Sequence, residues 1–395
     1  MNATDQRSET ARNWYRESEC SLEAFTHQLA RKAEFDLRFA IETNGDIPLY
    51  DCRALEEVLI DPAGEQALQA EWANVLRDGA GVLVLKHAFR DTTPVDEATC
   101  IFEQIIRQER ESGTHAADHF AKAGANDRIW NAHEKLCLAA PSVFARYFSN
   151  AFIASVAQAW LGLGFQMTTQ VNVVRPSGEA QQAHRDYHLG FQTVEQAQRF
   201  PAHVHTMSPF LTLQGAVAHS DMPIESGPTK LLLFSQRYAE GYLAWRRPDF
   251  REFFETHCVQ LPLAKGDALF FNPALFHAAG ANRTQDVQRM ANLLQISSAY
   301  GRAMETVDRM RMCEAVYPVL LDWQANGEFT AAAIESVIAS TAEGYAFPTN
   351  LDRDPPAGGL APASQQALMR RALEEKWNAS MLREALELQA WKRSR

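Results

Sequence analysis

The sequence predicts a mixed α/β protein with a double-stranded β-helix, a cupin-like jelly roll, at its core and helices at both ends. Short apolar strands separated by turns fill residues 166–296, a pattern typical of a sandwich or barrel. The segments before and after this region have helical patterns instead. At 395 residues, with 46% hydrophobic and 22% charged residues, the chain can form a substantial core.

The first half of the chain is predicted to be largely helical. Within the first sixty residues, which we expect to be mostly helix and connector, Ser21 is suited to cap a helix from residue 22 to about 35. A helix over 66–76 ends at Asp78-Gly79, and a buried strand follows at 82–85. Further helices are predicted over 96–110 and 140–161.

The last hundred residues return to helical patterns, with helices predicted over 303–314, 317–325 and 330–341. The Pro- and Gly-rich segment 347–359 is predicted to be a connector. One long helix is expected over 364–391, and its apolar residues are spaced to face one surface, either within the chain or in a homodimer: Leu368, Ala372, Ala379, Leu382 and Leu386. We therefore predict a single domain with an N-terminal helical extension (1–64), a core (65–300) and a helical C-terminal region (301–395).

The most informative motif is His184-Arg185-Asp186. On an extended strand side chains alternate, so His184 and Asp186 project to one side and Arg185 to the other. A third candidate, His277, follows a predicted buried strand over 268–271 and a break at Pro273. Two imidazoles and one carboxylate that leave other coordination positions open form the facial arrangement of non-haem Fe(II) oxygenases. We predict that these three residues are catalytic metal ligands.

Other readings of the histidines stay open. His184 and Asp186 would otherwise be a structural pair in a turn, and His277 a core residue. His203-x-His205 is a cupin-like metal pattern, although it falls in a predicted loop. The remaining alternative metal ligands are His188 and His219.

An arginine follows the third candidate ligand at a position where it could bind a carboxylate near the metal. After a polar turn, a new apolar strand over 290–296 opens at Arg289. The planar guanidinium fork can bond both oxygens of a carboxylate at once. Arg289 is therefore predicted to bind the distal carboxylate of 2-oxoglutarate, the co-substrate of such oxygenases, whereas Arg283 in the turn should point outward.

Together, His184-x-Asp186, the segment 277–284 and Arg289 resemble the phytanoyl-CoA dioxygenase family of Fe(II)/2-oxoglutarate oxygenases. Residues 225–229 resemble its usual turn, and residues 77–85 resemble the helix end, glycine turn and strand with which its members open. The resemblance covers roughly residues 65–300.

The resemblance implies that Fe(II), 2-oxoglutarate and O2 are the cofactor and co-substrates. It implies hydroxylation of an unactivated C–H bond of a small molecule, with release of succinate and CO2. Asp186 favours hydroxylation over chlorination, because related halogenases carry a small residue at that position. Desaturation, cyclisation and epoxidation use the same ligands, so the sequence leaves them open.

The sequence departs from the family pattern at three places, one of which is an extra residue between His277 and the arginine. Residues 234–237 stand where the family usually has Pro-Gly-Ser-His, and Ala279 stands where a serine often helps to hold the co-substrate. The second contact to 2-oxoglutarate is therefore left among three residues, with Arg283 as a rival of Arg289: Asn172, Gln170 and Thr284. Three residues after the metal motif are predicted to line the substrate pocket or to cover the core: Tyr187, His188 and Phe191.

Charge and composition exclude several classes of partner. The net charge of -11 argues against a general nucleic-acid binder and against a strongly anionic substrate such as a coenzyme A thioester. The longest apolar stretch, 152–163, is too short to span a bilayer, and the N-terminus lacks the apolar segment of a signal peptide. Six scattered cysteines without a Cys-x-x-Cys pair fit a reducing compartment, so we expect a cytoplasmic protein.

Two functions from other classes compete with the oxygenase. One is a cupin-like metal-dependent hydrolase or isomerase, which would not need Arg289. The other is a non-catalytic binding protein that keeps the fold.

Overall fold

The computed structural model describes residues 13–31, 36–113 and 126–394. Their contacts divide the chain into two compact units, each assembled from separate segments. The first unit takes residues 1–90, 116–128 and 171–294, and the second takes 91–115, 129–170 and 295–395. The division into 1–64, 65–300 and 301–395 stays a prediction.

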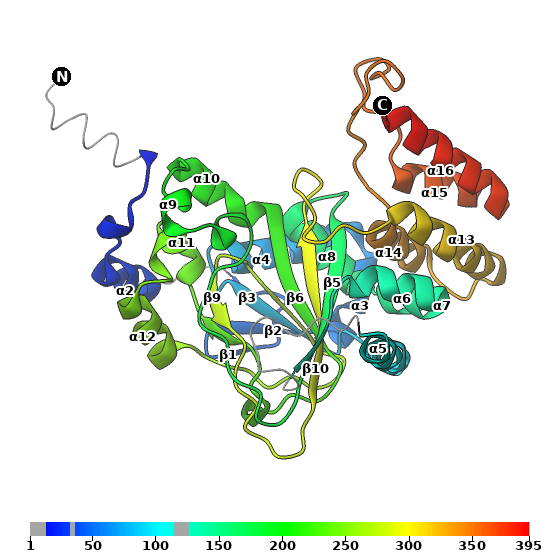
Figure 1. The fold of residues 1–395 in the computed structure, drawn as a ribbon. Helices are drawn as coiled ribbons and strands as arrows, with labels where there is room; N and C mark the ends of the chain where they lie inside the picture. The colour runs from blue at the N-terminus through cyan, green and yellow to red at the C-terminus, as the bar shows by residue number, and fades with distance from the viewer. Residues whose placement is uncertain (1–12, 32–35, 114–125, 395) are drawn as a thin grey trace, which may run out of the picture. The chain divides into compact units, whose positions relative to one another are not determined.

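A large, mostly antiparallel sheet is the main β element (Figure 1). Its strands follow the order β1-β2-β3-β8-β6-β10-β5-β4, and a smaller sheet pairs β7 with β9. β2 and β3 run parallel, whereas β1–β2, β3–β8, β6–β8 and β7–β9 are antiparallel pairs. The predicted mixed α/β class with a jelly-roll core is confirmed. The strand bounds are β1 Glu42–Asn44, β2 Ile47–Asp51, β3 Val82–Lys86, β4 Asn126–Ile129, β5 Gln166–Val174, β6 Thr212–Ala218, β7 Lys230–Leu232, β8 Ala268–Phe271, β9 Phe276–Ala278 and β10 Arg289–Ser297.

Side-chain alternation along neighbouring strands builds the core of the first unit. Val82 pairs with Phe271 and Val84 with Leu269 across β3 and β8. All four side chains enter one buried apolar cluster because alternate residues of a strand share a face. Burying each such side chain contributes roughly 1.5–3 kcal/mol. This packing fixes β8, which leads directly into β9 and His277.

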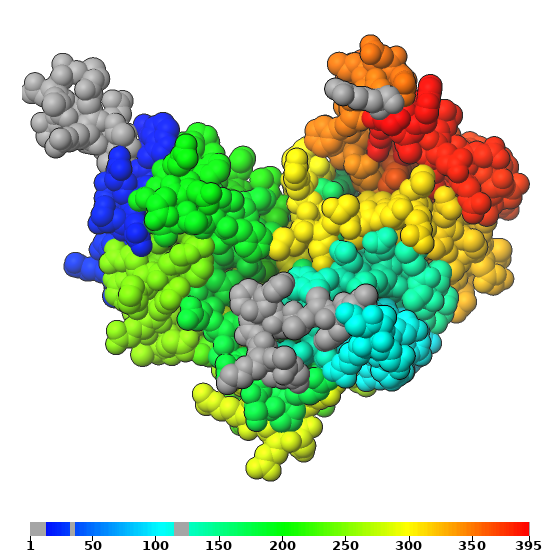
Figure 2. Space-filling model, viewed as in Figure 1, coloured from blue at the N-terminus to red at the C-terminus, as the bar shows by residue number. Residues whose placement is uncertain are grey.

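Helices and short helical turns complete the first unit. Phe25 of α2 packs against Phe250 of α12 at a ring distance of 5.2 Å and stacks on Phe276 of β9 at 5.4 Å. In the space-filling view, the blue N-terminal residues lie against the green surface of the same unit (Figure 2). The Glu17 amide donates a hydrogen bond to the Gln198 side chain. The bounds are η1 Glu17–Glu19, α2 Leu22–Ala30, α3 Cys52–Ile60, α4 Pro62–Arg77, η2 His188–Phe191, α9 Val194–Ala197, α10 Ala202–Met207, η3 Ser208–Leu211, η4 Ile224–Ser226, η5 Ser235–Arg237, α11 Gly241–Ala244 and α12 Pro248–His257.

The second unit is mainly helical, and α13 contacts several of its helices. The Tyr317 hydroxyl of α13 lies 2.8 Å from the Ala372 carbonyl and 2.7 Å from the Trp377 carbonyl, which connects α13 to the C-terminal helices. The bounds are α5 Thr93–Glu111, α6 Ala132–Ala139, α7 Pro141–Phe148, α8 Ala151–Leu161, α13 Arg309–Asn326, α14 Ala331–Thr341, α15 Gln365–Glu374 and α16 Ala379–Arg393.

Two predicted helices are each divided into two. The segment 140–161 forms α7 and α8, because the Asn150 side chain accepts a hydrogen bond from the Ile153 amide and starts a new helix. The segment 364–391 forms α15 and α16, because Lys376 adopts a φ of 51° and Asn378 caps the second helix. Of the residues expected to share one surface, Ala379 is exposed and the other four are buried within this chain.

In α13, by contrast, two predicted helices form a single helix. The prediction of helices at 303–314 and 317–325 was wrong, because one helix starts after Asp308, whose side chain caps it, and continues through Pro318. A proline inside a helix removes one hydrogen bond. Met312, Val316 and Tyr317 are fully buried, and their packing offsets that loss.

Three further expectations need correction. The first sixty residues include the β1–β2 hairpin, whose Asn44-Gly45 turn uses a φ of 62° at the glycine. α2 has the predicted cap at Ser21 but ends at Ala30, and residues 32–35 lie outside the described chain. The strand-rich region 166–296 also contains helices, and His203 and His205 lie on α10, not in a loop.

No helix in the described parts of the chain is long and apolar enough to cross a membrane. All six cysteines are free thiols.

Candidate metal centre

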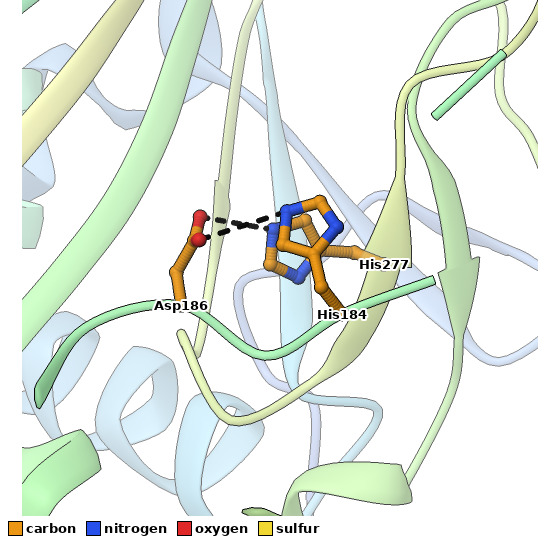
Figure 3. Close-up of side chains that lie close together, drawn as sticks. All are labelled: His184, Asp186 and His277. Atoms are coloured by element: carbon orange, nitrogen blue, oxygen red, sulfur yellow. Dashed lines mark ion pairs between the residues drawn. The ribbon is translucent and has the colours of Figure 1, made fainter. Parts of the chain in front are cut away.

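His184, Asp186 and His277 lie together in the first unit (Figure 3). His184 and His277 form a single antiparallel bridge, in which each backbone N–H donates to the other's carbonyl at 3.0 and 3.2 Å. The extended backbone brings Asp186 back to the same side, although residues 184–186 do not form the continuous strand that we predicted. The smaller sheet therefore supports both histidines, because His277 belongs to β9.

The three side chains converge closely enough to share one ion. His184 Nε2 lies 3.6 Å from Asp186 Oδ1, and His277 Nε2 lies 3.4 Å from Asp186 Oδ2. One ligand atom from each residue fits within 4.8 Å of the others. Among residues 13–31, 36–113 and 126–394, this is the one group of three or more His, Cys, Asp or Glu side chains with such geometry.

Backbone carbonyls orient both imidazole rings. His184 Nδ1 lies 2.8 Å from the Gln182 carbonyl, and His277 Nδ1 lies 2.8 Å from the Leu275 carbonyl. A carbonyl only accepts hydrogen bonds, so each Nδ1 must carry the proton. Each Nε2 then presents its lone pair to the shared centre, which is the form of histidine that binds a metal.

The charges are also suited to a cation. Burial alone would raise the pKa of Asp186, but His184 and His277 hold it well below its usual value, so the carboxylate is ionised. Burial and the nearby His184 lower the pKa of His277, which favours the neutral ring. For His184, burial is opposed by Asp186, which raises the pKa above its usual value. A metal ion would therefore compete with a proton for Nε2 of His184.

Arg185 points away from His184 and Asp186, as alternation predicts, and holds the backbone between them in place. Its buried guanidinium donates to the Ser235 and Tyr238 carbonyls at 2.6 and 3.0 Å. It also lies 5.0 Å from the Tyr242 ring and 5.1 Å from the Phe276 ring. These contacts hold the backbone from which His184 and Asp186 project.

Arg289 is a buried cation at the start of β10. Its residue is 6% exposed, and its side chain makes no ion pair or hydrogen bond with any residue that the structure describes. Burial lowers the pKa of Arg289 to about 10, which still leaves it charged at neutral pH. Arg283, by contrast, is exposed. A buried charge without a counter-ion is unfavourable, so Arg289 is suited to an anionic ligand.

The other predicted co-substrate contacts have different surroundings. Gln170 and Asn172 are both buried on β5, and Asn172 Oδ1 accepts no hydrogen bond from the described residues. The Thr284 hydroxyl instead donates to Asn282 Oδ1 at 2.6 Å and closes the turn after β9. Thr284 therefore already has a structural partner.

The predicted substrate residues form a strained segment directly after Asp186. Tyr187 is 3% exposed with a φ of 62°, and His188 has a φ of 38°, both unusual for residues with side chains. His188 Nδ1 lies 3.0 Å from the Ser208 hydroxyl. Phe191 is 57% exposed, so it does not cover the core.

Sequence reasoning missed Gln214, whose Nε2 donates to Asp186 Oδ2 at 2.5 Å from β6. A glutamine within the otherwise apolar run Leu213-Gln214-Gly215-Ala216-Val217 was the available signal.

A family model for phytanoyl-CoA dioxygenase (PhyH) matches residues 67–291, more than half of the chain. The chain belongs to the PhyH family. It is accordingly an Fe- and 2-oxoglutarate-dependent enzyme that uses O2, and the donor set of two imidazoles and a carboxylate fits iron. No curated protein matches this PhyH-family chain significantly.

Several solved structures resemble the chain distantly. The α-ketoglutarate-dependent epimerase SnoN from nogalamycin biosynthesis is 20% identical, with a TM-score of 0.39 over 60% of this chain and 84% of SnoN. The carbocyclase SnoK from the same biosynthesis is 20% identical, with a TM-score of 0.42 over 60% and 86%. HygX from Streptomyces hygroscopicus, solved with nickel and 2-oxoglutarate, is 15% identical, with a TM-score of 0.38 over 57% and 86%. At these values, the neighbours assign neither a substrate nor site residues to this PhyH-family chain.

Proposed function

We propose that His184, Asp186 and His277 bind one Fe(II) and that the enzyme hydroxylates an unactivated C–H bond of a small molecule. The observation that carries the metal assignment is the orientation of the two imidazoles: both Nε2 atoms face Asp186, and both Nδ1 atoms face backbone carbonyls. An internal hydrogen-bonding role would not require two rings to converge on one carboxylate in the same tautomer.

The second part of the proposal concerns the co-substrate. Arg289 would bind the distal carboxylate of 2-oxoglutarate, because it is a buried guanidinium without an ion-pair partner among the described residues. Asn172 is the better candidate for a further contact, because it is buried on β5 and no hydrogen bond of its side chain to another described residue is seen, whereas Thr284 is engaged in its turn. Asn172 would contribute through its amide N–H donors.

In the proposed reaction, the side chains of the protein would hold the metal and orient the substrate. The iron, with 2-oxoglutarate and O2, would supply the oxidant, placing one oxygen atom in succinate and the other in the product, with loss of CO2. His184, Asp186 and His277 would keep three coordination positions and leave the others open. Arg185 would keep the ligand segment in place through its carbonyl contacts. Tyr187, His188 and Phe191 would contact the substrate.

The test uses the purified chain with Fe(II), 2-oxoglutarate and a panel of uncharged and cationic small metabolites, with succinate as the readout. For a compound that stimulates succinate release, mass spectrometry in labelled O2 should find one labelled oxygen atom in the product. A product that loses two hydrogens without gaining oxygen would contradict hydroxylation. Turnover without 2-oxoglutarate would contradict the oxygenase assignment.

A further inference from the structure

We infer that Gln214 is a positioning residue that orients the carboxylate of Asp186 for metal binding. This inference rests on the proposed metal site, and it concerns a residue that does not itself supply a ligand atom. Gln214 lies on β6, opposite Phe271 of β8, and its residue is 4% exposed. It therefore approaches the site from the large sheet, whereas the histidines are supported by the smaller one.

The orientation of the Gln214 amide is fixed by chemistry. An ionised carboxylate can only accept hydrogen bonds, so the Gln214 nitrogen, and not its oxygen, must face Asp186 Oδ2. The bond has a charged acceptor and a buried donor, which makes it stronger than a bond between neutral groups. A neutral amide also adds no positive charge that would repel a metal cation.

The Gln214–Asp186 hydrogen bond does not connect two strands of the large sheet, because Asp186 lies outside the strands. It is the one hydrogen bond that the Gln214 side chain makes with a described residue, and its Oε1 accepts none from them. Gln236, a buried glutamine in the same unit, instead donates to the Gly79 carbonyl and connects two backbone segments. The Gln214 amide is directed at the carboxylate alone.

Holding Oδ2 determines how Asp186 can approach a metal. The Gln214 bond opposes rotation of the carboxylate, and it occupies the oxygen that lies 3.4 Å from His277 Nε2. Oδ1, 3.6 Å from His184 Nε2, is left without a hydrogen-bond donor from the large sheet. Gln214 therefore favours binding through Oδ1, and its loss should weaken the metal site although all three ligands remain.

The experiment measures Co(II) binding to the metal-free full chain by calorimetry, for wild type, Gln214→Met, Asp186→Ala and the double variant. Methionine keeps a similar volume and removes the donor. Gln214→Met should weaken Co(II) binding by roughly ten- to hundredfold, the usual effect of removing a group that orients a ligand. In the Asp186→Ala background, the same substitution should change Co(II) binding less than threefold, because Gln214 then has no carboxylate to orient.

Gln236→Met is the matched control, since it removes a buried amide that faces the backbone; it should leave Co(II) binding unchanged. Wild-type affinity in Gln214→Met, or equal losses in both backgrounds, would overturn the inference. If Gln214→Met does not fold, Gln214→Asn replaces it: its amide stops one methylene short, so it should also weaken Co(II) binding, and unchanged binding would overturn the inference. Loss of binding in His184→Ala with normal binding in Gln214→Met would refute only the role of Gln214. Wild-type affinity in His184→Ala would refute the proposed metal site itself.

Discussion

His184 and His277 share one local arrangement, in which a carbonyl two positions earlier in the chain holds Nδ1 and frees Nε2. This arrangement depends on backbone geometry and not on a second side chain. The same backbone segments are joined by the hydrogen bonds between residues 184 and 277. The positions of the two imidazoles are thus coupled, and the carboxylate of Asp186 is held separately by Gln214.

At the residue scale, Arg289→Ala tests the co-substrate contact. Deleting one partner of a buried arginine–carboxylate pair should cost on the order of 3 kcal/mol. At about 1.4 kcal/mol per factor of ten, the KM for 2-oxoglutarate should rise roughly a hundredfold while iron stays bound. Arg283→Ala is the control, because Arg283 is exposed and should have little effect. A large effect at Arg283 with none at Arg289 would reverse the assignment.

At the element scale, the short turn η2 determines the path of the ligand segment. Gly190 in this turn donates its N–H to the Tyr187 carbonyl at 2.7 Å, and Arg246 donates to the Gly190 carbonyl at 2.9 Å. A Cβ atom at Gly190 would lie 2.1 Å from the Arg185 carbonyl oxygen, which is far closer than van der Waals contact. The turn and the ligand segment can pack this closely because residue 190 is glycine.

Gly190→Ala should therefore weaken metal binding without changing a ligand. The clash involves backbone atoms between His184 and Asp186, so relief requires the ligand segment to move, at a cost of about 1–3 kcal/mol. We expect Co(II) binding to the metal-free chain to weaken at least tenfold, as measured by calorimetry. Gly327→Ala, at an open position with a φ of 64°, should cost about 1 kcal/mol of stability and leave Co(II) binding unchanged. Equal effects of both variants on binding would refute this account.

A second prediction at this scale concerns α6 in the helical unit. Burial, with Arg309 nearby, lowers the pKa of His133 to about 3, and the ring packs between Phe144 and Phe148 with Nε2 2.8 Å from the Ser340 carbonyl. Between pH 6.5 and 3, His133 is protonated in the unfolded state and neutral in the folded state. The stability contribution of the neutral ring is therefore complete above pH 6.5 and is lost as the pH falls.

Denaturant unfolding of the metal-free protein at several pH values measures this effect. His133→Gln should reduce the slope of unfolding free energy against pH by up to about 1.4 kcal/mol per pH unit within that window. His203→Gln, at an exposed histidine, should leave the slope as in wild type. An unchanged slope in His133→Gln would show that His133 titrates equally in both states.

At the scale of the whole molecule, residues with strong local signals were the most predictable. The alternation at 184–186 and the short strand 268–271 indicated that His184, Asp186 and His277 converge, and Ser21 caps a helix where expected. Helix breaks were less predictable, because Asn150 and Lys376 interrupt patterns that are otherwise continuous, whereas tertiary packing carries α13 through Pro318. A glutamine within an apolar run made Gln214 a visible candidate. Its bond to Asp186 joins residues 28 positions apart on different elements, so the partner could not be predicted from a local pattern.

The most direct test of the central claim is anaerobic addition of 2-oxoglutarate to the Fe(II)-loaded enzyme, followed by visible absorption. Fe(II) chelated by the keto and carboxylate oxygens of 2-oxoglutarate gives a charge-transfer band that neither component gives alone. We predict this band in wild type with one iron per chain, its loss in His184→Ala and His277→Ala, and its appearance only at much higher 2-oxoglutarate in Arg289→Ala. A full-strength band in His277→Ala, or no band in wild type that binds both iron and 2-oxoglutarate, would contradict the account.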